Sequence, residues 1–228
     1  MTEYVFPPAP PASVAILGTA ARFPVRRIFC VGRNYADHVR EMGGEPERTP
    51  PIFCPKPADA VADTGATIPY PPLTNDLHHE AELVIAIGAQ AKAIAAERAD
   101  EVIWGYSTGI DLTRRDLQAI AKKGGQPWDW AKAFDLSAPC GPLIPAAPGL
   151  GRKGRITLSV NGETRQDSDI AEMIWSVPEI VAACSAAVTL MPGDLIFTGT
   201  PAGVGPLVRG DRVRAMIEGL PDLEIAIG

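Results

Sequence analysis

The segment "HHEAELVIAIG", residues 78–88, joins two histidines and two glutamates to an uninterrupted apolar run. Residues 83–87 are all leucine, valine, isoleucine or alanine, which predicts a strand buried in the core. Residues two apart in a strand point to the same face, so Glu80 and Glu82 are expected side by side, with Cα atoms about 6.6–7 Å apart. Two partly buried carboxylates repel each other, and each is costly to remove from water.

A divalent cation between these carboxylates would remove both penalties. Oxygen ligands without cysteine favour Mg²⁺, Mn²⁺ or Ca²⁺ over zinc. The alternative is a solvated pair at an exposed strand end, and for an isolated Glu-x-Glu that is the better interpretation. A third acid, Asp111, ends the apolar run "WGYSTGI" at residues 104–110, although it could equally cap a following helix. Three acids at strand ends, without a competing Cys/His cluster, predict an oxygen-ligated metal site.

The chain has three histidines, at positions 38, 78 and 79. His38 precedes Glu41 by three residues, so the two side chains share one face of a predicted helix. A carboxylate orients an imidazole and raises its basicity, which suits a general base acting on water. Such a pair is more often a simple surface contact. His78 and His79 are interpreted as supporting partners of the acids or as surface residues.

The remaining patterns predict more strands than helices. Asn34 is expected to cap a helix in "NYADHVREMG" (34–43) and Gly43-Gly44 to end it, and Ser176 with Glu179 forms a capping box before "VPEIVAACSAAV" (177–188). Strands are expected at 25–32, 51–61, 80–88 and 104–113, helices at 91–101 and 114–125, and a hairpin at 155–167 turning at Asn161-Gly162. The elements do not alternate as βαβ units, so a mostly β, mixed-sheet (α+β) domain is predicted rather than a Rossmann or TIM fold.

Length and composition narrow the possible functions. The chain has 228 residues, 46% of them hydrophobic, and a net charge of −6, which disfavours a nucleic-acid or membrane surface. A Pro/Ala-rich arm is expected at residues 1–24, followed by one larger domain at 25–228. The start lacks the features of a secretory signal, so a cytoplasmic location is expected. The four scattered cysteines are expected to be free thiols.

Six segments together resemble the fumarylacetoacetate hydrolase family, in particular its short bacterial acylpyruvate and fumarylpyruvate hydrolases. They are "CVGRNYADHVREMG", "HHEAELVIAIG", "WGYSTGIDLTRRDLQ", "WAKAFD", "VNGETRQ" and "GDLIFTGTPAGVGP". They follow the family's order from about residue 25 to the C-terminus. The resemblance implies a mixed β-roll or sandwich fold and a homodimer.

The resemblance also implies roles for individual residues. It places Mg²⁺ or Mn²⁺ on Glu80, Glu82 and Asp111. It makes His38 and Glu41 the pair that activates water, and Lys132 of "WAKAFD" an active-site lysine. Substrate contacts are implied for Arg33, Lys56, Arg115, Gln118 and Thr200. Pro55 departs from the family pattern and makes the role of Lys56 less secure.

The resemblance implies hydrolysis of a carbon–carbon bond in 2,4-diketo acids, with fumarylpyruvate as the preferred substrate. "FPVRRIFCVGRNYADHVREMGG" and "TRRDLQAIAKKGGQPW" favour the fumarylpyruvate branch. The alternatives are oxaloacetate decarboxylation, isomerisation of 2-hydroxyhepta-2,4-diene-1,7-dioate, and a catalytically inert metal-binding protein. A fumaryl tail ends in a carboxylate and needs a cation in its pocket, for which Arg40, Arg115 and Lys122 are the candidates.

Overall fold

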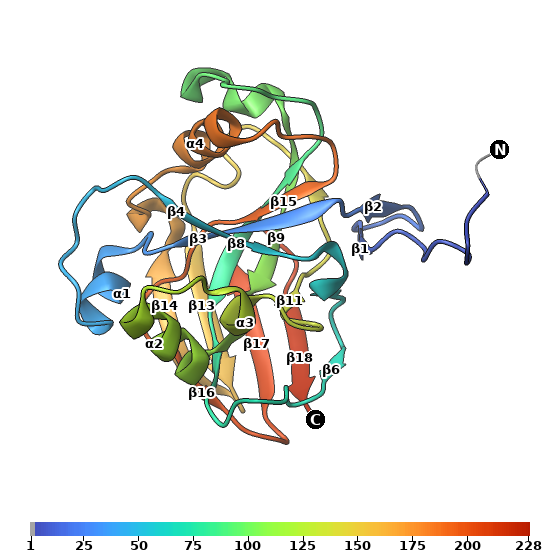
Figure 1. Cartoon of the computed structure of the whole chain (residues 1–228). Coiled ribbons are helices and arrows are strands. Elements are labelled where there is room, and N and C mark those ends of the chain that lie inside the picture. The colour runs from blue at the N-terminus through green and yellow to red at the C-terminus, as the bar shows by residue number, and fades with distance from the viewer. Residues whose placement is uncertain (1–2) are drawn as a thin grey trace.

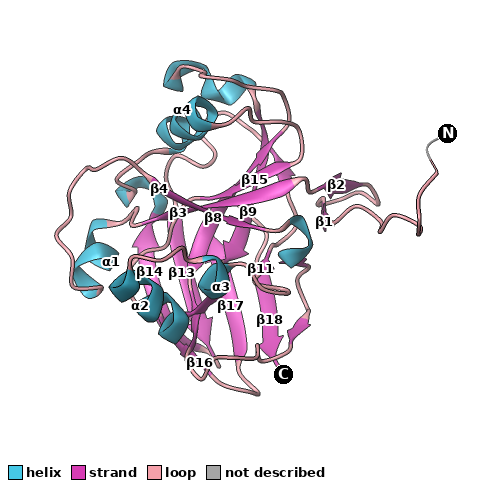
Figure 2. Ribbon diagram, viewed as in Figure 1, coloured by secondary structure: helices cyan, strands magenta, loops and turns pink. Residues whose placement is uncertain are grey.

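The computed structural model describes residues 3–228 and places two large sheets around a shared core (Figures 1 and 2). The six-stranded sheet runs in the order β12 (Ile144–Pro145), β9 (Ile103–Ile110), β8 (Ala81–Ile87), β15 (Asp194–Phe197), β3 (Arg27–Gly32) and β4 (Ile52–Lys56). The five-stranded sheet runs in the order β14 (Glu163–Asp169), β13 (Arg155–Val160), β17 (Arg212–Ile217), β18 (Leu223–Ile227) and β6 (Thr67–Ile68). Antiparallel pairs predominate, but β15–β3 and β18–β6 are parallel, which confirms a mixed-sheet fold.

Short sheets and helices complete the molecule. The small sheets are β1 (Ser13–Ala15) with β2 (Arg22–Pro24), β10 (Thr113–Arg114) with β7 (Leu77–His79) and β16 (Gly205–Leu207), and β11 (Ala138–Pro139) with β5 (Val61–Ala62). The helices are α1 (Ala36–Glu41), α2 (Arg115–Gly124), α3 (Asp129–Lys132) and α4 (Val177–Ala187), with 3₁₀ turns at Ala58–Ala60, Ala96–Glu101 and Ile170–Glu172. Among the described residues, no helix combines the length and hydrophobicity needed to cross a bilayer.

Strand β8 explains why the apolar run has no polar alternation. All seven of its residues are buried. Leu83, Ile85 and Ile87 pack into the larger core cluster, whereas Val84 and Ala86 pack into a second cluster on the other face. A strand covered on both faces needs apolar residues at every position, so a continuous run is the expected pattern.

Several local predictions are confirmed by the structure. Asn161 and Gly162, with φ of 53° and 84°, form the left-handed turn of the β13–β14 hairpin. Ser176 and Glu179 form the predicted capping box of α4. All four cysteines are free thiols.

Two local predictions are wrong. The predicted helix at 91–101 is reduced to the 3₁₀ turn at Ala96–Glu101, because Ala91 pairs with Leu190 as a β-bridge instead. Asn34 does not cap α1, since its side chain bonds backbone groups of Trp175 and Thr198. The strand expected at 80–88 is confirmed as β8, which begins at Ala81, one residue after Glu80.

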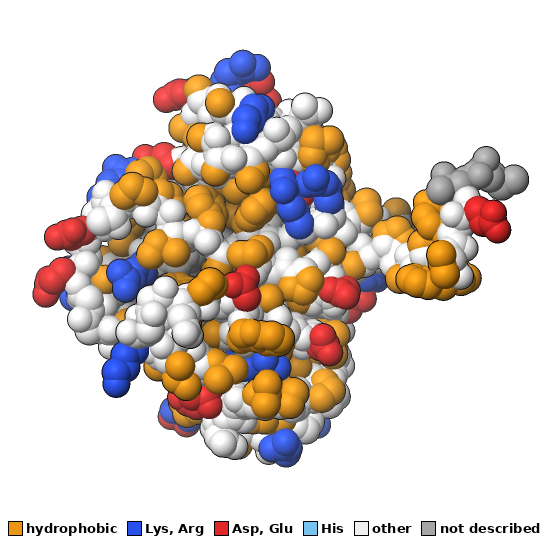
Figure 3. Space-filling view, viewed as in Figure 1, with side chains coloured by type: hydrophobic (Ala, Val, Ile, Leu, Met, Phe, Trp, Pro, Cys, Tyr) orange, Lys and Arg blue, Asp and Glu red, His pale blue; other side chains and the backbone are white. Residues whose placement is uncertain are grey.

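The N-terminal segment contains more structure than an extended chain. β1 pairs with β2 inside residues 1–24, and Val14 of this hairpin is fully buried. Before the hairpin the chain projects from the body, and Figure 3 shows apolar side chains along it. Tyr4, Val5 and Phe6 are 64%, 101% and 75% exposed.

Candidate active site

The three predicted metal ligands converge where β8 begins and β9 ends. Because these strands are antiparallel, Glu82 in β8 lies opposite Gly109, and the Asp111 N–H donates to the Glu80 carbonyl at 2.8 Å. One carboxylate oxygen from each of Glu80, Glu82 and Asp111 lies within 4.8 Å of the others, and all three residues are buried. Helix α2 begins only at Arg115, so Asp111 is not a helix cap.

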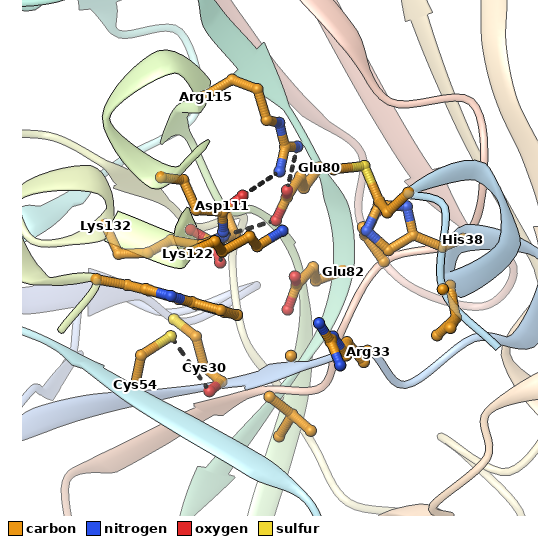
Figure 4. Close-up of a pocket in the computed structure, with 18 of the residues that line it drawn as sticks. Cys30, Arg33, His38, Cys54, Glu80, Glu82, Asp111, Arg115, Lys122 and Lys132 are labelled. Carbon is orange, nitrogen blue, oxygen red and sulfur yellow. Dashed lines mark hydrogen bonds and ion pairs between the residues drawn. The ribbon is translucent and has the colours of Figure 1, made fainter. Parts of the chain in front are cut away.

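Two cations hold part of this acidic cluster. The Lys132 ammonium, at the end of α3, donates to Glu80 at 2.7 Å and to Asp111 at 2.6 Å, and Arg115 donates to Glu80 at 2.5 Å (Figure 4). Burial alone would raise the pKa of Glu80, but Lys132 and Arg115 outweigh it and hold that pKa below its ordinary value. Burial and the negative charges of Asp111 and Glu80 raise the pKa of Glu82 well above its ordinary value.

The remaining oxygen atoms fit a hard divalent cation. Glu82 accepts one hydrogen bond through Oε2, from the Gly199 N–H at 2.8 Å. Oδ1 of Asp111 is buried without a hydrogen-bond donor in the described part of the chain; the Lys56 ammonium lies 2.9 Å away, outside hydrogen-bond geometry. Carboxylate oxygens are the ligands that Mg²⁺ and Mn²⁺ prefer. The positive charge of either ion would offset the electrostatic repulsion between Glu82 and the other two carboxylates.

His38 faces the same cavity from α1, across from Lys132 (Figure 4). The predicted pair forms: Nδ1 of His38 lies 3.0 Å from Oε2 of Glu41. Glu41 also accepts a hydrogen bond from the Gly203 N–H at 2.9 Å, so its carboxylate is fixed at both oxygens. With Nδ1 donating to Glu41, Nε2 of His38 is the nitrogen available to accept a proton.

Four of the five predicted substrate contacts line this cavity. They are Arg33, Arg115, Gln118 and Thr200. Lys56 does not line it: its ammonium is enclosed and donates to the carbonyls of Leu112, Lys132 and Ser137 at 3.1, 2.5 and 3.0 Å. Lys56 therefore supports the site through buried backbone contacts and does not face the cavity.

The three residues predicted as candidates for binding the carboxylate of the acyl tail differ in their surroundings. Arg40 pairs with Asp37 on the exposed side of α1 and does not line the cavity. Lys122 lines it, 5.2 Å from the ring centre of Trp128, and burial together with the charges of Arg115 and Arg33 lowers its pKa. Within residues 3–228, neither Lys122 nor Arg33 forms an ion pair with a carboxylate, whereas Arg115 binds Glu80.

Arg33 also has an unusual backbone. Its φ of 59° lies in the left-handed region, which non-glycine residues rarely adopt. Such strain persists where the surrounding structure enforces it, commonly at binding sites. The turn between β3 and α1 thus carries Arg33 to the cavity mouth.

Two residues that support the site were missed by the sequence interpretation. Gln166, fully buried, accepts from the Ala81 N–H and donates to Thr200 Oγ1 and the Pro201 carbonyl, so it ties the start of β8 to the 199–201 turn. Gly199 has a φ of 96°, and a Cβ there would lie 2.7 Å from Cβ of Asn34. Gln166 lies in "VNGETRQ" and Gly199 in "GTPAGVG", but no local spacing indicated that either residue supports the acids.

Comparison with known proteins identifies close relatives. The family model described as fumarylacetoacetate (FAA) hydrolase C-terminal matches residues 27–227. The chain is 42% identical to a fumarylpyruvate hydrolase of Ralstonia sp (78% of this chain, 92% of the relative) and 42% identical to an oxaloacetate tautomerase of Escherichia coli (89% and 93%). Its structure superposes with a TM-score of 0.96 and 50% identity, over 99% of each chain, on fumarylpyruvate hydrolase from Pseudomonas aeruginosa in complex with Mn²⁺ and pyruvate.

Proposed function

Because this chain belongs to the fumarylacetoacetate hydrolase family, we propose that it is a divalent-metal-dependent hydrolase that cleaves a carbon–carbon bond of acylpyruvates, with fumarylpyruvate preferred. Relatives on this scaffold include hydrolases, tautomerases and isomerases. Two of them match this chain with the same identity, so overall similarity does not choose between activities. The choice rests on what the site can do chemically.

The observation that carries the proposal is the His38–Glu41 pair facing the acidic cluster. Hydrolysis needs an activated water, whereas tautomerisation and decarboxylation do not. Glu41, held by the Gly203 N–H, binds Nδ1 of His38 and orients the imidazole, which leaves Nε2 to act on water. His38 thus has the position and partner of a general base.

A reaction sequence follows from these positions. Mg²⁺ or Mn²⁺ held by Glu80, Glu82 and Asp111 would supply Lewis-acid stabilisation of negative charge on the 2-oxo group. His38 removes a proton from water, whose oxygen adds to the C4 carbonyl, and Lys132 stabilises the resulting alkoxide. The C3–C4 bond then breaks, which releases a carboxylic acid and the enolate of pyruvate, and the enolate takes up a proton at C3.

The choice of a fumaryl tail is supported by cations of the cavity that form no ion pair with any carboxylate in the described part of the chain. The far carboxylate of fumarylpyruvate needs a positive partner that is not already neutralised. Lys122 and Arg33 meet this condition, whereas Arg40 points away and Arg115 is bound to Glu80. We propose Lys122, with Arg33, as the group that selects a carboxylate-bearing acyl tail.

The test is a substrate panel with and without Mn²⁺. Fumarylpyruvate, acetylpyruvate and oxaloacetate would be assayed for hydrolysis, and oxaloacetate also for decarboxylation and keto–enol exchange. We expect fumarylpyruvate to be hydrolysed best, and Lys122→Met to lower kcat/KM for fumarylpyruvate more than for acetylpyruvate. Turnover of oxaloacetate alone would favour a tautomerase or decarboxylase over a hydrolase. Turnover of none of the three compounds would favour a catalytically inert protein.

A substitution of His38 separates the reactions within one protein. His38→Ala should lower hydrolysis by on the order of 10²–10⁴, the usual contribution of a general base, with nearly unchanged Mn²⁺ affinity. Oxaloacetate decarboxylation, which needs mainly the cation, should survive much better. Equal loss of both activities would assign His38 to substrate binding or folding instead.

The remaining assignments stay proposals. We propose that residues 1–24 form an arm attached to a catalytic domain at 25–228, that the enzyme acts in the cytoplasm, and that it is a homodimer. The exposed apolar side chains of the N-terminal segment favour a partner surface. Sedimentation velocity would test this, because a monomer has a mass of 24.1 kDa.

A further inference from the structure

Two free cysteines lie opposite each other in the wall of the active-site cavity. Cys30 in β3 and Cys54 in β4 are direct partners across this antiparallel pair, and both line the cavity (Figure 4). Side chains of directly paired residues point to the same face of a sheet. Sγ of Cys54 lies 3.7 Å from the Cys30 carbonyl oxygen, so this thiol leans toward its partner residue. The proposed reaction uses neither sulfur.

The pairing fixes the distance between the two backbones. Pro55, the next residue of β4, pairs with Phe29 and has no backbone N–H, so that pair cannot exchange two hydrogen bonds. Because the two kinds of antiparallel pair alternate, Cys30 and Cys54 form the hydrogen-bonded kind, with Cα atoms about 5.5 Å apart. Disulfides join residues whose Cα atoms lie about 4.4–6.8 Å apart, so the strands need not move to close the bond.

The two thiols differ from the other cysteines in their surroundings. Cys30 and Cys54 are 1% and 9% exposed, but the cavity gives a small molecule a route to them. Cys140 and Cys184 are buried and do not line this cavity. The side-chain interaction with Cys30 lowers the pKa of Cys54, whereas burial raises the pKa of Cys30, so Cys54 is the thiol that more readily forms the reactive thiolate.

We propose that Cys30 and Cys54 are a dithiol that hydroperoxides oxidise, through the cavity, to a disulfide. The sulfur of Cys54 attacks one peroxide oxygen and becomes a sulfenic acid, while the other oxygen leaves as an alcohol, or as water from hydrogen peroxide. The sulfur of Cys30 then attacks the sulfenic sulfur and expels water. Each sulfur loses one electron, the peroxide gains both, and a thiol reductant reverses the change. The proposal does not depend on which reaction the enzyme catalyses.

The experiment exposes the Mg²⁺-loaded full chain to hydrogen peroxide, blocks the remaining thiols and maps peptides without reduction. We expect a cross-linked Cys30–Cys54 peptide, a protein mass lower by two hydrogen atoms, and full recovery with dithiothreitol. Cys140 and Cys184 should remain reduced in the same sample. A Cys140→Ser/Cys184→Ser variant should form the same disulfide, whereas Cys54→Ser should form none.

The wild-type peptide map decides the question even if a variant fails to fold. Sulfinic acid on either pocket cysteine without a cross-linked peptide would overturn the proposal, because it would show that the partner thiol cannot reach. So would oxidation of Cys140 or Cys184 before the pocket pair. Pocket thiols that stay reduced under peroxide that oxidises glutathione in a separate, parallel sample would overturn it as well.

Discussion

At the scale of single residues, Lys56 shows how a buried charge can organise a site that it does not enter. Its side chain is completely enclosed, and its ammonium bonds three backbone carbonyls and lies beside Asp111. Those contacts join the end of β4 to the segment after β9 and to the end of α3. The lysine thus fixes Asp111 and the backbone of Lys132 relative to each other.

Replacing Lys56 by methionine should therefore be strongly destabilising. It leaves three carbonyls without their donor and Asp111 with Lys132 as its remaining cation, and losing one partner of a buried pair costs about 3–5 kcal/mol. Denaturant unfolding would measure the loss, and calorimetry should show weaker Mn²⁺ binding as Asp111 loses its support. Lys153→Met, which removes an exposed lysine, is the matched control and should change neither quantity. A Lys56→Met protein as stable as this control would contradict the role.

His79 makes stability depend on pH. Burial lowers the pKa of His79 to about 4, so the folded protein keeps it neutral. The unfolded chain takes up that proton below about pH 6.5, so stability is lost as the pH falls from 6.5 toward 4, by up to about 3 kcal/mol. Urea unfolding of wild type and His79→Gln at pH 7 and pH 4.5 isolates this contribution, because other acids contribute equally to both. Equal losses in the two proteins would rule it out.

At the scale of elements, the sequence predicted best where local chemistry decides the structure. The Asn161-Gly162 turn and the Ser176–Glu179 box depend on neighbouring residues, and both form. The 91–101 segment and Asn34 were predicted wrongly because distant partners override their local preference. Ala91 forms a β-bridge with Leu190, and the Asn34 side-chain amide donates to the backbone carbonyls of Trp175 and Thr198.

The same distinction explains what could be predicted of the site. The spacing of Glu80 and Glu82 at the start of β8 is local, and Asp111 follows β9, which pairs with β8. The enclosure of Lys56 and the contacts of Gln166 arise from packing between segments more than 30 residues apart in the chain. Residue spacing does not predict contacts between distant segments. The family resemblance could therefore indicate that Lys56 belongs to the site, but not that its side chain points away from the cavity.

Helix α1 carries the proposed base on little anchoring. It has six residues, buries only His38 and Val39, and is followed by an exposed loop through Pro50. Few buried apolar contacts mean a low cost of local opening. We expect fast hydrogen exchange at residues 36–50 in the free enzyme and slower exchange with Mn²⁺ and pyruvate, while β8 stays protected in both states. Mass spectrometry of exchange would test this, and uniform protection of both segments would argue for a rigid, preformed site.

At the scale of the whole molecule, the acidic cluster joins strands whose pairing depends on the complete fold. β8 is buried between two core clusters, and Glu82 stands at its start where β9 ends. In the folded chain, oxygen atoms of the three carboxylates lie within 4.8 Å of one another. The unfolded chain does not hold them together. A cation that binds this cluster must therefore favour the native state.

Metal binding and folding are therefore linked through this cluster. Mn²⁺ at about 100 times its Kd should stabilise the native state by about 2.7 kcal/mol, since it binds the folded chain alone. For a protein of this size, each kcal/mol raises Tm by about 2–4 °C, so a rise on the order of 5–10 °C is expected in calorimetry, reversed by EDTA. Glu82→Ala should abolish the rise and the metal-dependent activity, whereas Glu97→Ala, at an exposed position, should keep both. K⁺ at equal ionic strength should not reproduce the effect. A Glu82→Ala protein that Mn²⁺ stabilises as much as wild type would place the metal elsewhere, because Glu82 is the carboxylate of the cluster that no cation neutralises among the described residues.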